Sequence, residues 1–328
     1  MAKSQEKFKT AIGGQALIEG IMMRGPEKDA IVVRKADGLD IQVTTRKKPA
    51  PHSVKTWPLI RGVVNFFDAQ VCGVKALMHS ADLSPEAEDA QEEMSKFDKW
   101  LEKKLGDERF QKYLVGSAVA LGLMMSIGLF FLLPFLVKEV LGRWIENQLL
   151  LHLLEGVVRI LLFVTYMILA SRMKEMKRVF AYHGAEHKTI RCYEAGLPLT
   201  VENVKQQTRL HPRCGTSFLF VVMILSILVF SVASTLFLEP MLSGMEKGFL
   251  YSLIMIVSKL LLIPIVVAIA YELNRLVGRH DNWFTRIMTA PGMWFQHLTT
   301  NEPDESMIEV GIASLQAVLP EQEGDDLW

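Results

Sequence analysis

The polar stretch Phe180-Ala-Tyr-His-Gly-Ala-Glu-His-Lys-Thr189 lies between two long apolar runs and decides how this chain is organised. Its two histidines, His183 and His187, are four residues apart, so a helix would place both imidazoles on one face, where they could share one ion. Glu186 stands between them, in the order His-x-x-Glu-His. This is the inverted zincin spacing, in which two imidazoles bind zinc and the carboxylate activates a water. The stretch therefore predicts half of a metal site.

A second stretch, Leu210-His-Pro-Arg-Cys-Gly-Thr216, follows after a loop and can complete the site. Either His211 or Cys214 would be the third ligand, and Glu194 is a further oxygen donor. The alternative is that these side chains are interfacial polar groups, packed near lipid headgroups or hydrogen-bonded to one another. We favour a divalent metal, with Zn²⁺ as the expected ion, because the complete three-residue motif is accompanied by a nearby His-x-x-Cys.

The composition indicates a membrane protein that does not bind nucleic acid. Half of the 328 residues are hydrophobic, and they are concentrated in blocks. The formal net charge is zero, so no overall field attracts nucleic acid. The N-terminus lacks the apolar core of a signal peptide. Cys72, Cys192 and Cys214 form no even set at disulfide spacing, and we expect all three in the cytoplasm, where thiols stay reduced.

Four apolar segments are long enough to cross a hydrocarbon layer of roughly 30 Å. They are residues 113 to 137, 148 to 171, 215 to 238 and 249 to 271. The connector of residues 172 to 214 is rich in lysine and arginine, whereas the other two connectors are short. The positive-inside rule therefore places this middle connector and both termini in the cytoplasm. The candidate metal site would then face the cytoplasm at the surface of the cell membrane.

Three ionisable residues fall inside the second and fourth of these spans. Glu155 and Arg159 form an i, i+4 pair. Arg159 and Lys259 each lie about ten residues from the start of their span, or roughly 15 Å deep at about 1.5 Å per residue. Ionisable residues at such depth usually face a partner or a cavity. We therefore predict one buried cluster, and we favour a structural ion cluster that fixes helix packing over a transport path.

The N-terminal region is predicted to contain a hairpin and an amphipathic helix. Residues 11 to 26 include four glycines, which indicate close backbone approach and not a regular helix. Residues 31 to 34 and 39 to 44 alternate apolar and polar side chains around Asp37-Gly38, which is a hairpin signal. Residues 59 to 80 repeat apolar side chains at helical spacing. This helix either lies on the membrane or turns its stripe toward the protein core.

These segments predict a mainly α fold, a four-helix transmembrane bundle with a small α+β cytoplasmic cap. The expected parts are a cytoplasmic N-terminal region (1–80), an acidic linker with a charged helix (81–112), a four-span membrane domain (113–272) and cytoplasmic C-terminal helices with an acidic tail (273–328). The N-terminal segments and the last helix, residues 303 to 319, are too small to bury their own apolar faces. We expect them to pack together over the connector, where Glu19 or Arg24 could reach the metal site.

Four blocks of the sequence carry a family resemblance. They are residues 13–20 with 22–26, residues 182–188, residues 210–216, and Pro291-Gly292 with Thr299-Thr300 and Glu302-Pro303. With these blocks the chain resembles a family of bacterial inner-membrane proteins of unknown function, the YqhQ-like predicted metal-dependent enzymes. Asn301 departs from the pattern, which more often has a basic residue there. The resemblance implies a metal-dependent enzyme in the membrane, and it supplies no substrate or reaction.

Three classes of function remain open, and the sequence does not define the oligomeric state. The first is a metal-dependent enzyme, with a zinc hydrolase as the leading candidate: His183 and His187 would bind Zn²⁺, His211 or Cys214 would be the third ligand, and Glu186 would be the catalytic base. Its substrate would be a lipid, an amphiphile or a membrane-bound peptide. The second is a non-catalytic membrane assembly protein with a structural metal or polar cluster. The third is a small transporter that uses the charged cluster in the spans.

The topology can be tested with reporter fusions. Fusions at Gly142 and Gly244, in the two short connectors, should read as external, and a fusion at Gly196 should read as internal. The expected reason is the basic charge of the middle connector. An external reporter at Gly196 would contradict the topology and, with it, a cytoplasmic metal site.

Overall fold

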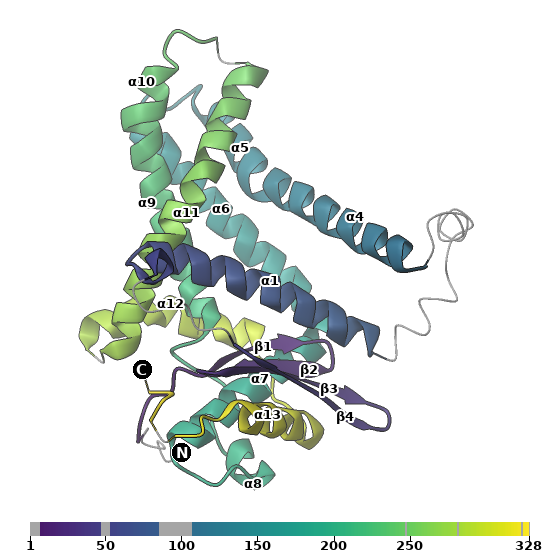
Figure 1. Cartoon of the computed structure of the whole chain (residues 1–328). Coiled ribbons are helices and arrows are strands. Elements are labelled where there is room, and N and C mark those ends of the chain that lie inside the picture. The colour runs from purple at the N-terminus through teal and green to yellow at the C-terminus, as the bar shows by residue number, and fades with distance from the viewer. Residues whose placement is uncertain are drawn as a thin grey trace. The chain divides into compact units, whose positions relative to one another are not determined.

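The computed structural model describes residues 7–46, 53–84, 107–246, 248–280, 282–322 and 324–327. The chain divides into two compact units. The first unit consists of Met1–Pro85, Met167–Val222 and Val267–Trp328, and the second of Glu86–Tyr166 and Met223–Val266. The protein is mainly helical and contains a small antiparallel sheet near its N-terminus, as the sequence predicts (Figure 1).

A four-stranded antiparallel sheet, in the order β1-β2-β3-β4, lies in the first unit. The strands are β1 (Gly13–Leu17), β2 (Gly20–Arg24), β3 (Lys28–Lys35) and β4 (Gly38–Thr45). The predicted hairpin is present as β3 and β4, and Gly38 has a φ of +147°, which residues with a side chain rarely adopt. The glycine-rich opening adds a second hairpin, β1–β2, that the sequence analysis missed. Gly20 lets β2 approach β3 closely, because a Cβ there would lie 2.6 Å from the carbonyl oxygen of Val32.

Helices cover both faces of this sheet (Figure 1). Ile21 and Met23 of β2 pack against α7 (Lys174–Glu194) and α13 (Glu305–Val318). Met22, between them, packs on the opposite face against Ala76 of α1 (Ile60–Asp82). Successive side chains of a strand point to opposite faces, so a strand covered on both sides is apolar at every position. The N-terminal sheet and the C-terminal helix therefore share one core, as predicted.

The helix α1 packs through small residues and not through its apolar stripe. Its buried residues are Gly62, Gly73, Ala76 and Ser80. A Cβ at Gly73 would lie 2.3 Å from Oε1 of Gln15, so the glycine lets α1 approach the sheet. The stripe points outward, with exposed fractions of 54% for Phe67, 56% for Val71 and 45% for Val74. The expectation that this stripe faces the core is therefore wrong, and its contact with a membrane stays a prediction.

The C-terminal helix begins at Glu305, two residues after the start of the predicted segment 303 to 319. Asp304 caps α13, since its carboxylate accepts a hydrogen bond of 2.9 Å from the backbone nitrogen of Met307. The sequence predicts one apolar stripe on this helix, formed by Met307, Ile308, Ile312, Leu315 and Val318. Ile312 is partly buried and the other four are buried. The remaining elements of the first unit include η1 (Val54–Thr56), α8 (Val201–Lys205) and α12 (Trp283–Thr299).

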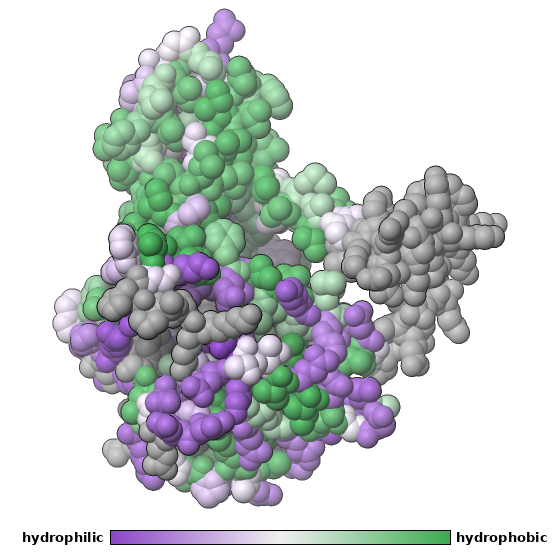
Figure 2. Space-filling view, viewed as in Figure 1, coloured by the Kyte–Doolittle hydropathy of each residue, from purple (hydrophilic) through white to green (hydrophobic). Residues whose placement is uncertain are grey.

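Four helical segments are long and apolar enough to cross a membrane: Gly116–Leu141, Gln148–Ala170, Phe218–Met241 and Phe249–Arg279. Their elements are α4 (Asp107–Ile127), η2 (Gly128–Leu132), α5 (Leu133–Leu141), α6 (Gln148–Ala170), α9 (Gly215–Ala233), η3 (Ser234–Leu238), α10 (Glu239–Met241) and α11 (Phe249–Arg279). In Figure 2 the visible surface over α10 and over the parts of α9 and α11 in the second unit is hydrophobic almost throughout, as a lipid environment requires. The four predicted spans are thus confirmed as apolar helices. Most of the predicted acidic linker, residues 81 to 112, lies outside the described residues.

The second unit contains the predicted ion cluster. Nζ of Lys259 lies 2.6 Å from Oε2 of Glu155, and Nη2 of Arg159 lies 3.0 Å from Oε1 of the same carboxylate. All three residues are buried, with exposed fractions of 2%, 3% and 9% for Lys259, Glu155 and Arg159. Arg159 also donates from Nε to the carbonyl oxygen of Phe130, 2.8 Å away in the π-helical turn η2. The cluster therefore links α6 to α11 and to η2.

The cluster continues toward a second carboxylate. Nδ1 of His152 lies 3.5 Å from Oε2 of Glu155, and its Nε2 lies 3.0 Å from Oε1 of Glu239. Lys138 is 4.0 Å from the same Glu239 oxygen. Each charged group thus has an opposite partner inside the unit, which favours the structural interpretation of the cluster.

We expect Glu155→Gln to destabilise the protein by about 3–5 kcal/mol, because it leaves two buried cations without their shared carboxylate. Lys259→Met should cost less, since Arg159 still pairs with Glu155. Glu146→Gln, at an exposed position, is the control and should be neutral. Thermal unfolding in one detergent would measure the order of the three variants. A Glu155→Gln protein as stable as the control would contradict the assignment.

Candidate metal centre

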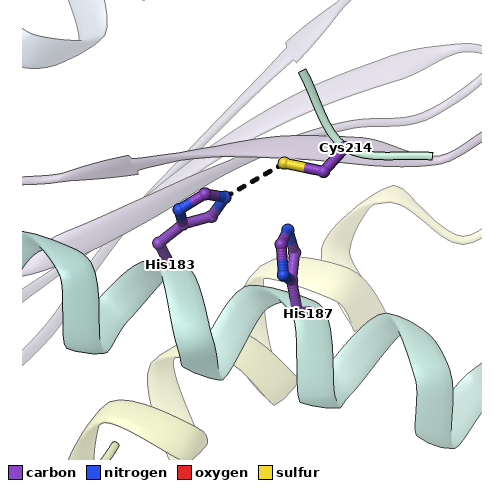
Figure 3. Close-up of side chains that lie close together, drawn as sticks. All are labelled: His183, His187 and Cys214. Carbon is purple, nitrogen blue, oxygen red and sulfur yellow. Dashed lines mark hydrogen bonds between the residues drawn. The ribbon is translucent and has the colours of Figure 1, made fainter. Parts of the chain in front are cut away.

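Three side chains converge on one point beside α7. His183 and His187 lie on consecutive turns of this helix, with their ring centroids 4.3 Å apart. Both side chains rise toward Cys214, which lies in the loop before α9 (Figure 3). Nε2 of His183 is 3.2 Å from Sγ of Cys214. One donor atom from each of the three residues lies within 4.8 Å of the other two, so the helical spacing and the loop bring three potential metal ligands together.

Backbone carbonyls orient both imidazoles. Nδ1 of His183 lies 2.9 Å from the carbonyl oxygen of Thr299, and Nδ1 of His187 lies 2.6 Å from that of Arg209. A carbonyl oxygen can only accept, so each Nδ1 carries a proton and donates it. This is the arrangement that holds metal-ligating histidines, and it leaves both Nε2 atoms as potential ligands. Nε2 of His187 is buried and has no hydrogen-bond partner among the described residues.

The electrostatics of Cys214 and His183 favour an ion pair when no metal is bound. Burial opposes ionisation of Cys214, but His187 and His183 hold the pKa of its thiol well below the ordinary value. Burial also opposes a charge on His183, yet Cys214, Glu186 and the carbonyl of Thr299 together more than offset it, and the pKa of His183 rises to about 9. The proton shared by Nε2 of His183 and Sγ of Cys214 therefore lies where a cation could bind. Binding of a metal ion there would release that proton.

Glu186 borders the three side chains and is covered by the N-terminal sheet. The backbone N–H of Gly14 in β1 donates to its carboxylate, and a Cβ at Gly14 would lie 2.9 Å from Cδ of Glu186. Burial raises the pKa of Glu186, although His183 and His187 act in the opposite sense. Its Oε2 is buried without a hydrogen-bond partner among the described residues. The close backbone approach predicted for the glycine-rich opening is thus made at this carboxylate.

His211 lies beside the α7 histidines, with its ring centroid 5.6 Å from that of His187, and it pairs with Glu194. Nε2 of His211 lies 3.1 Å from Oε2 of Glu194, whose two oxygens each accept a hydrogen bond of 2.6 Å from Arg213. The backbone nitrogen of Thr10 also donates to this carboxylate, at 3.0 Å. Burial lowers the pKa of His211 to about 4 in spite of Glu194, so the ring is neutral at pH 7. Of the two predicted candidates for a third ligand, the structure brings Cys214 to the α7 histidines and leaves His211 bonded to Glu194.

Glu19 and Arg24 pair with other groups. The carboxylate of Glu19 accepts a hydrogen bond of 2.6 Å from Nη2 of Arg178, and it also lies 3.2 Å from the hydroxyl of Tyr182. Nη2 of Arg24 lies 2.7 Å from Asp68 of α1. These contacts hold the sheet to α7 and to α1. The N-terminal group that contacts Glu186 is the backbone N–H of Gly14, and not the side chain of Glu19 or Arg24 that the sequence suggested.

The segment of residues 299 to 303, for which the sequence indicated only a family resemblance, crosses α7 at Gly184. The backbone nitrogen of Asn301 donates to the carbonyl of Phe180 at 2.8 Å, and a Cβ at Gly184 would lie only 2.0 Å from the carbonyl oxygen of Asn301. Glycine lowers helix stability by about 1 kcal/mol relative to alanine, so its presence between two ligand-type histidines was the signal for this crossing. The same segment provides the Thr299 carbonyl that orients His183.

The fold and the site define a helical membrane-associated protein with two histidines and a cysteine clustered beside a buried glutamate. The chain belongs to the family described as "Protein of unknown function (DUF1385)", whose sequence profile matches residues 57–321. It is 32% identical over 323 residues to "Uncharacterized protein YqhQ" of Bacillus subtilis (strain 168), which covers 96% of this chain and 94% of that protein. No solved structure matches. The family indicated by the sequence blocks is therefore confirmed.

Gly184→Ala tests the crossing of residues 299 to 303 over α7. The added methyl group would force the Asn301 carbonyl away, and we expect a loss of roughly 1–3 kcal/mol. Gly122→Ala in α4 is the matched control, since a Cβ there meets nothing within 4 Å and alanine favours a helix. Thermal unfolding of both variants in detergent would measure the difference. Equal stability of the two would show that Gly184 is not required by a close contact.

Proposed function

We propose that this protein is a metal-dependent membrane hydrolase whose Zn²⁺ is held by His183, His187 and Cys214. The observation that carries the proposal is the convergence of two Nε2 atoms and one Sγ, with both Nδ1 atoms fixed by backbone carbonyls. Nitrogen and sulfur donors suit zinc. Their separations of 4.8 Å or less are close to the about 4 Å that zinc–ligand bond lengths imply. The unpartnered, buried Nε2 of His187 fits a ligand atom that awaits its ion.

A set of three protein ligands favours a catalytic over a structural zinc site. Structural sites are closed by four protein ligands, whereas catalytic sites keep one position for water or substrate. His211 is the nearby residue that could have closed the site, and it is bonded to Glu194 instead. Zinc in such a site acts as a Lewis acid and lowers the pKa of a coordinated water to about 7.

Glu186 is the proposed general base. Its carboxylate is buried beside His183 and His187, and the N–H of Gly14 orients it while Oε2 stays unpartnered among the described residues. Burial raises the pKa of Glu186, which brings its basicity closer to neutral pH. In the proposed role Glu186 accepts the proton of the attacking water and later returns it to the leaving group.

The position of the ligands suggests a substrate at the membrane surface. Cys214 stands just before the apolar span Phe218–Met241, and α7 follows the span Gln148–Ala170 closely in the chain. A lipid, an amphiphile or a membrane-bound peptide would therefore reach the site more readily than a soluble compound. The positive-inside rule places this surface on the cytoplasmic side.

The competing proposal is a structural metal in a non-catalytic membrane assembly protein. Deep burial favours it, since Glu186 and His187 expose only 4% and 1% of their surface. In that case loss of the metal would unfold the first unit, because metal-binding free energy would be part of its folding free energy. The two proposals share the ligands and differ in the role of Glu186.

Metal analysis of the protein purified in detergent tests the ligands. The wild type and Glu186→Gln should each hold about one zinc per chain, whereas His187→Ala and Cys214→Ala should lose it. His297→Ala, at an exposed position of α12, is the matched control and should keep the metal. A wild-type protein without zinc after loading and desalting, or a His187→Ala protein that retains it, would contradict the site.

Catalysis is tested with ester, phosphoester and peptide substrates in mixed micelles. Glu186→Gln should keep its zinc and its thermal stability while hydrolysis falls by about 10²–10⁴-fold, the range expected for loss of a general base. Full activity of Glu186→Gln would remove its proposed role. Absence of hydrolysis by the zinc-loaded wild type, together with unfolding on chelation, would support the structural alternative.

A further inference from the structure

A basic cavity lies in the first unit, separate from the metal centre. It has a volume of about 130 Å³ and is formed by the end of α11, the start of α12, the turn before α9 and the N-terminal segment. Its cationic lining groups are Lys9, Arg213 and Arg286, joined by His280 and by the amide of Asn274. No carboxylate of the described residues lines it. The cavity therefore offers positive charge and hydrogen-bond donors to a small anion.

The positive character extends beyond this cavity. A more open recess beside it shares Lys9 and His280 and adds Arg279. Two buried carboxylates stand behind the lining: Glu194 bonds Arg213, and Asp326 accepts a hydrogen bond from the hydroxyl of Thr10. Neither carboxylate is among the described residues that line the cavity or the recess, and the charged side chains of that lining are basic.

Large exposed apolar side chains occupy the first turns of α12, the helix whose residue Arg286 lines the cavity. Trp283, Phe284 and Ile287 have exposed fractions of 74%, 42% and 61%, and they are neighbours in sequence of the lining residue Arg286. The helix α12 follows the apolar span Phe249–Arg279 directly, so the cavity lies at one end of a membrane span. Aromatic rings next to cations at the end of a span are typical of the interface between acyl chains and headgroups.

We propose that this cavity binds the phosphate group of an anionic phospholipid headgroup. Arginine donates two parallel hydrogen bonds to a phosphate, and lysine contributes a compact charge. Trp283, Phe284 and Ile287 would then contact the upper acyl chains of the same leaflet. A lipid is favoured over a soluble phosphate because these apolar side chains would otherwise face water next to the site. The inference uses none of the proposed zinc ligands and stands apart from the hydrolase proposal.

The test is a titration of the full-length protein, in a neutral detergent, with short-chain phosphatidylglycerol. Phosphatidylcholine of the same chain length and inorganic phosphate are titrated separately, and isothermal calorimetry gives the Kd of each. We expect the double variant Lys9→Gln/Arg286→Gln to raise the Kd for phosphatidylglycerol by roughly thirty-fold. The reason is that each cation near an anionic lipid contributes to the binding free energy, and the double variant removes two of them. Arg172→Gln removes an exposed cation near the end of another span and should change the Kd by less than about three-fold.

Trp283→Ala is the second variant and separates the two sources of phosphate. It should weaken binding of phosphatidylglycerol and leave binding of inorganic phosphate unchanged. Equal Kd values for the wild type and the double variant, both with unchanged thermal midpoints, would overturn the proposal, as would equal binding of phosphatidylcholine. Inorganic phosphate bound as tightly as phosphatidylglycerol would overturn the lipid assignment and identify a site for soluble phosphate.

Discussion

Burial of the polar face of α7 is the constraint on which the first unit depends. This helix is covered by the sheet and by α13, yet Glu186, His187, Lys188 and Glu194 expose 5% or less of their surface. Buried polar groups need partners, and most of these groups have them. Lys188 donates to the carbonyl of Lys205 at 3.0 Å, and Glu194 accepts from Arg213. Among the described residues, the buried side-chain atoms of α7 left without a hydrogen bond are Oε2 of Glu186 and Nε2 of His187, both at the proposed metal centre.

Sequence alone predicted the parts of the fold that depend on local pattern. The four spans follow from apolar runs of membrane length, and the β3–β4 hairpin from Asp37-Gly38, because few other structures use these patterns. The β1–β2 hairpin was missed because its glycines serve close contacts made by distant segments, such as Gly14 against Glu186. The same holds for α1, where Gly73 and Ala76 form the contact with the sheet and the larger stripe stays outside. A periodic stripe shows that a helix is amphipathic and does not show which face meets the protein.

The candidate site was predictable in its helical half only. The spacing of His183 and His187 follows from helix geometry, but His211 and Cys214 lie in one turn and were equally good third ligands by sequence. The choice between them depends on Glu194, which reaches His211 only because the chain folds back after α7. The carbonyls of Thr299 and Arg209 that orient the imidazoles carry no sequence signal, since every residue has a carbonyl group.

The two buried polar clusters of this chain differ in a way that bears on function. In the second unit Glu155 is paired with Lys259 and Arg159, and the buried side-chain atoms left unpartnered among its described residues are neutral hydroxyls on α9 and η3. A fully paired ionic network is rigid and offers no vacant ligand to a transported ion. The centre on α7 has the opposite property, because an imidazole nitrogen and a carboxylate oxygen are buried there without partners. Such atoms are costly unless something binds them. This difference favours chemistry at His183, His187 and Cys214 over transport through the spans.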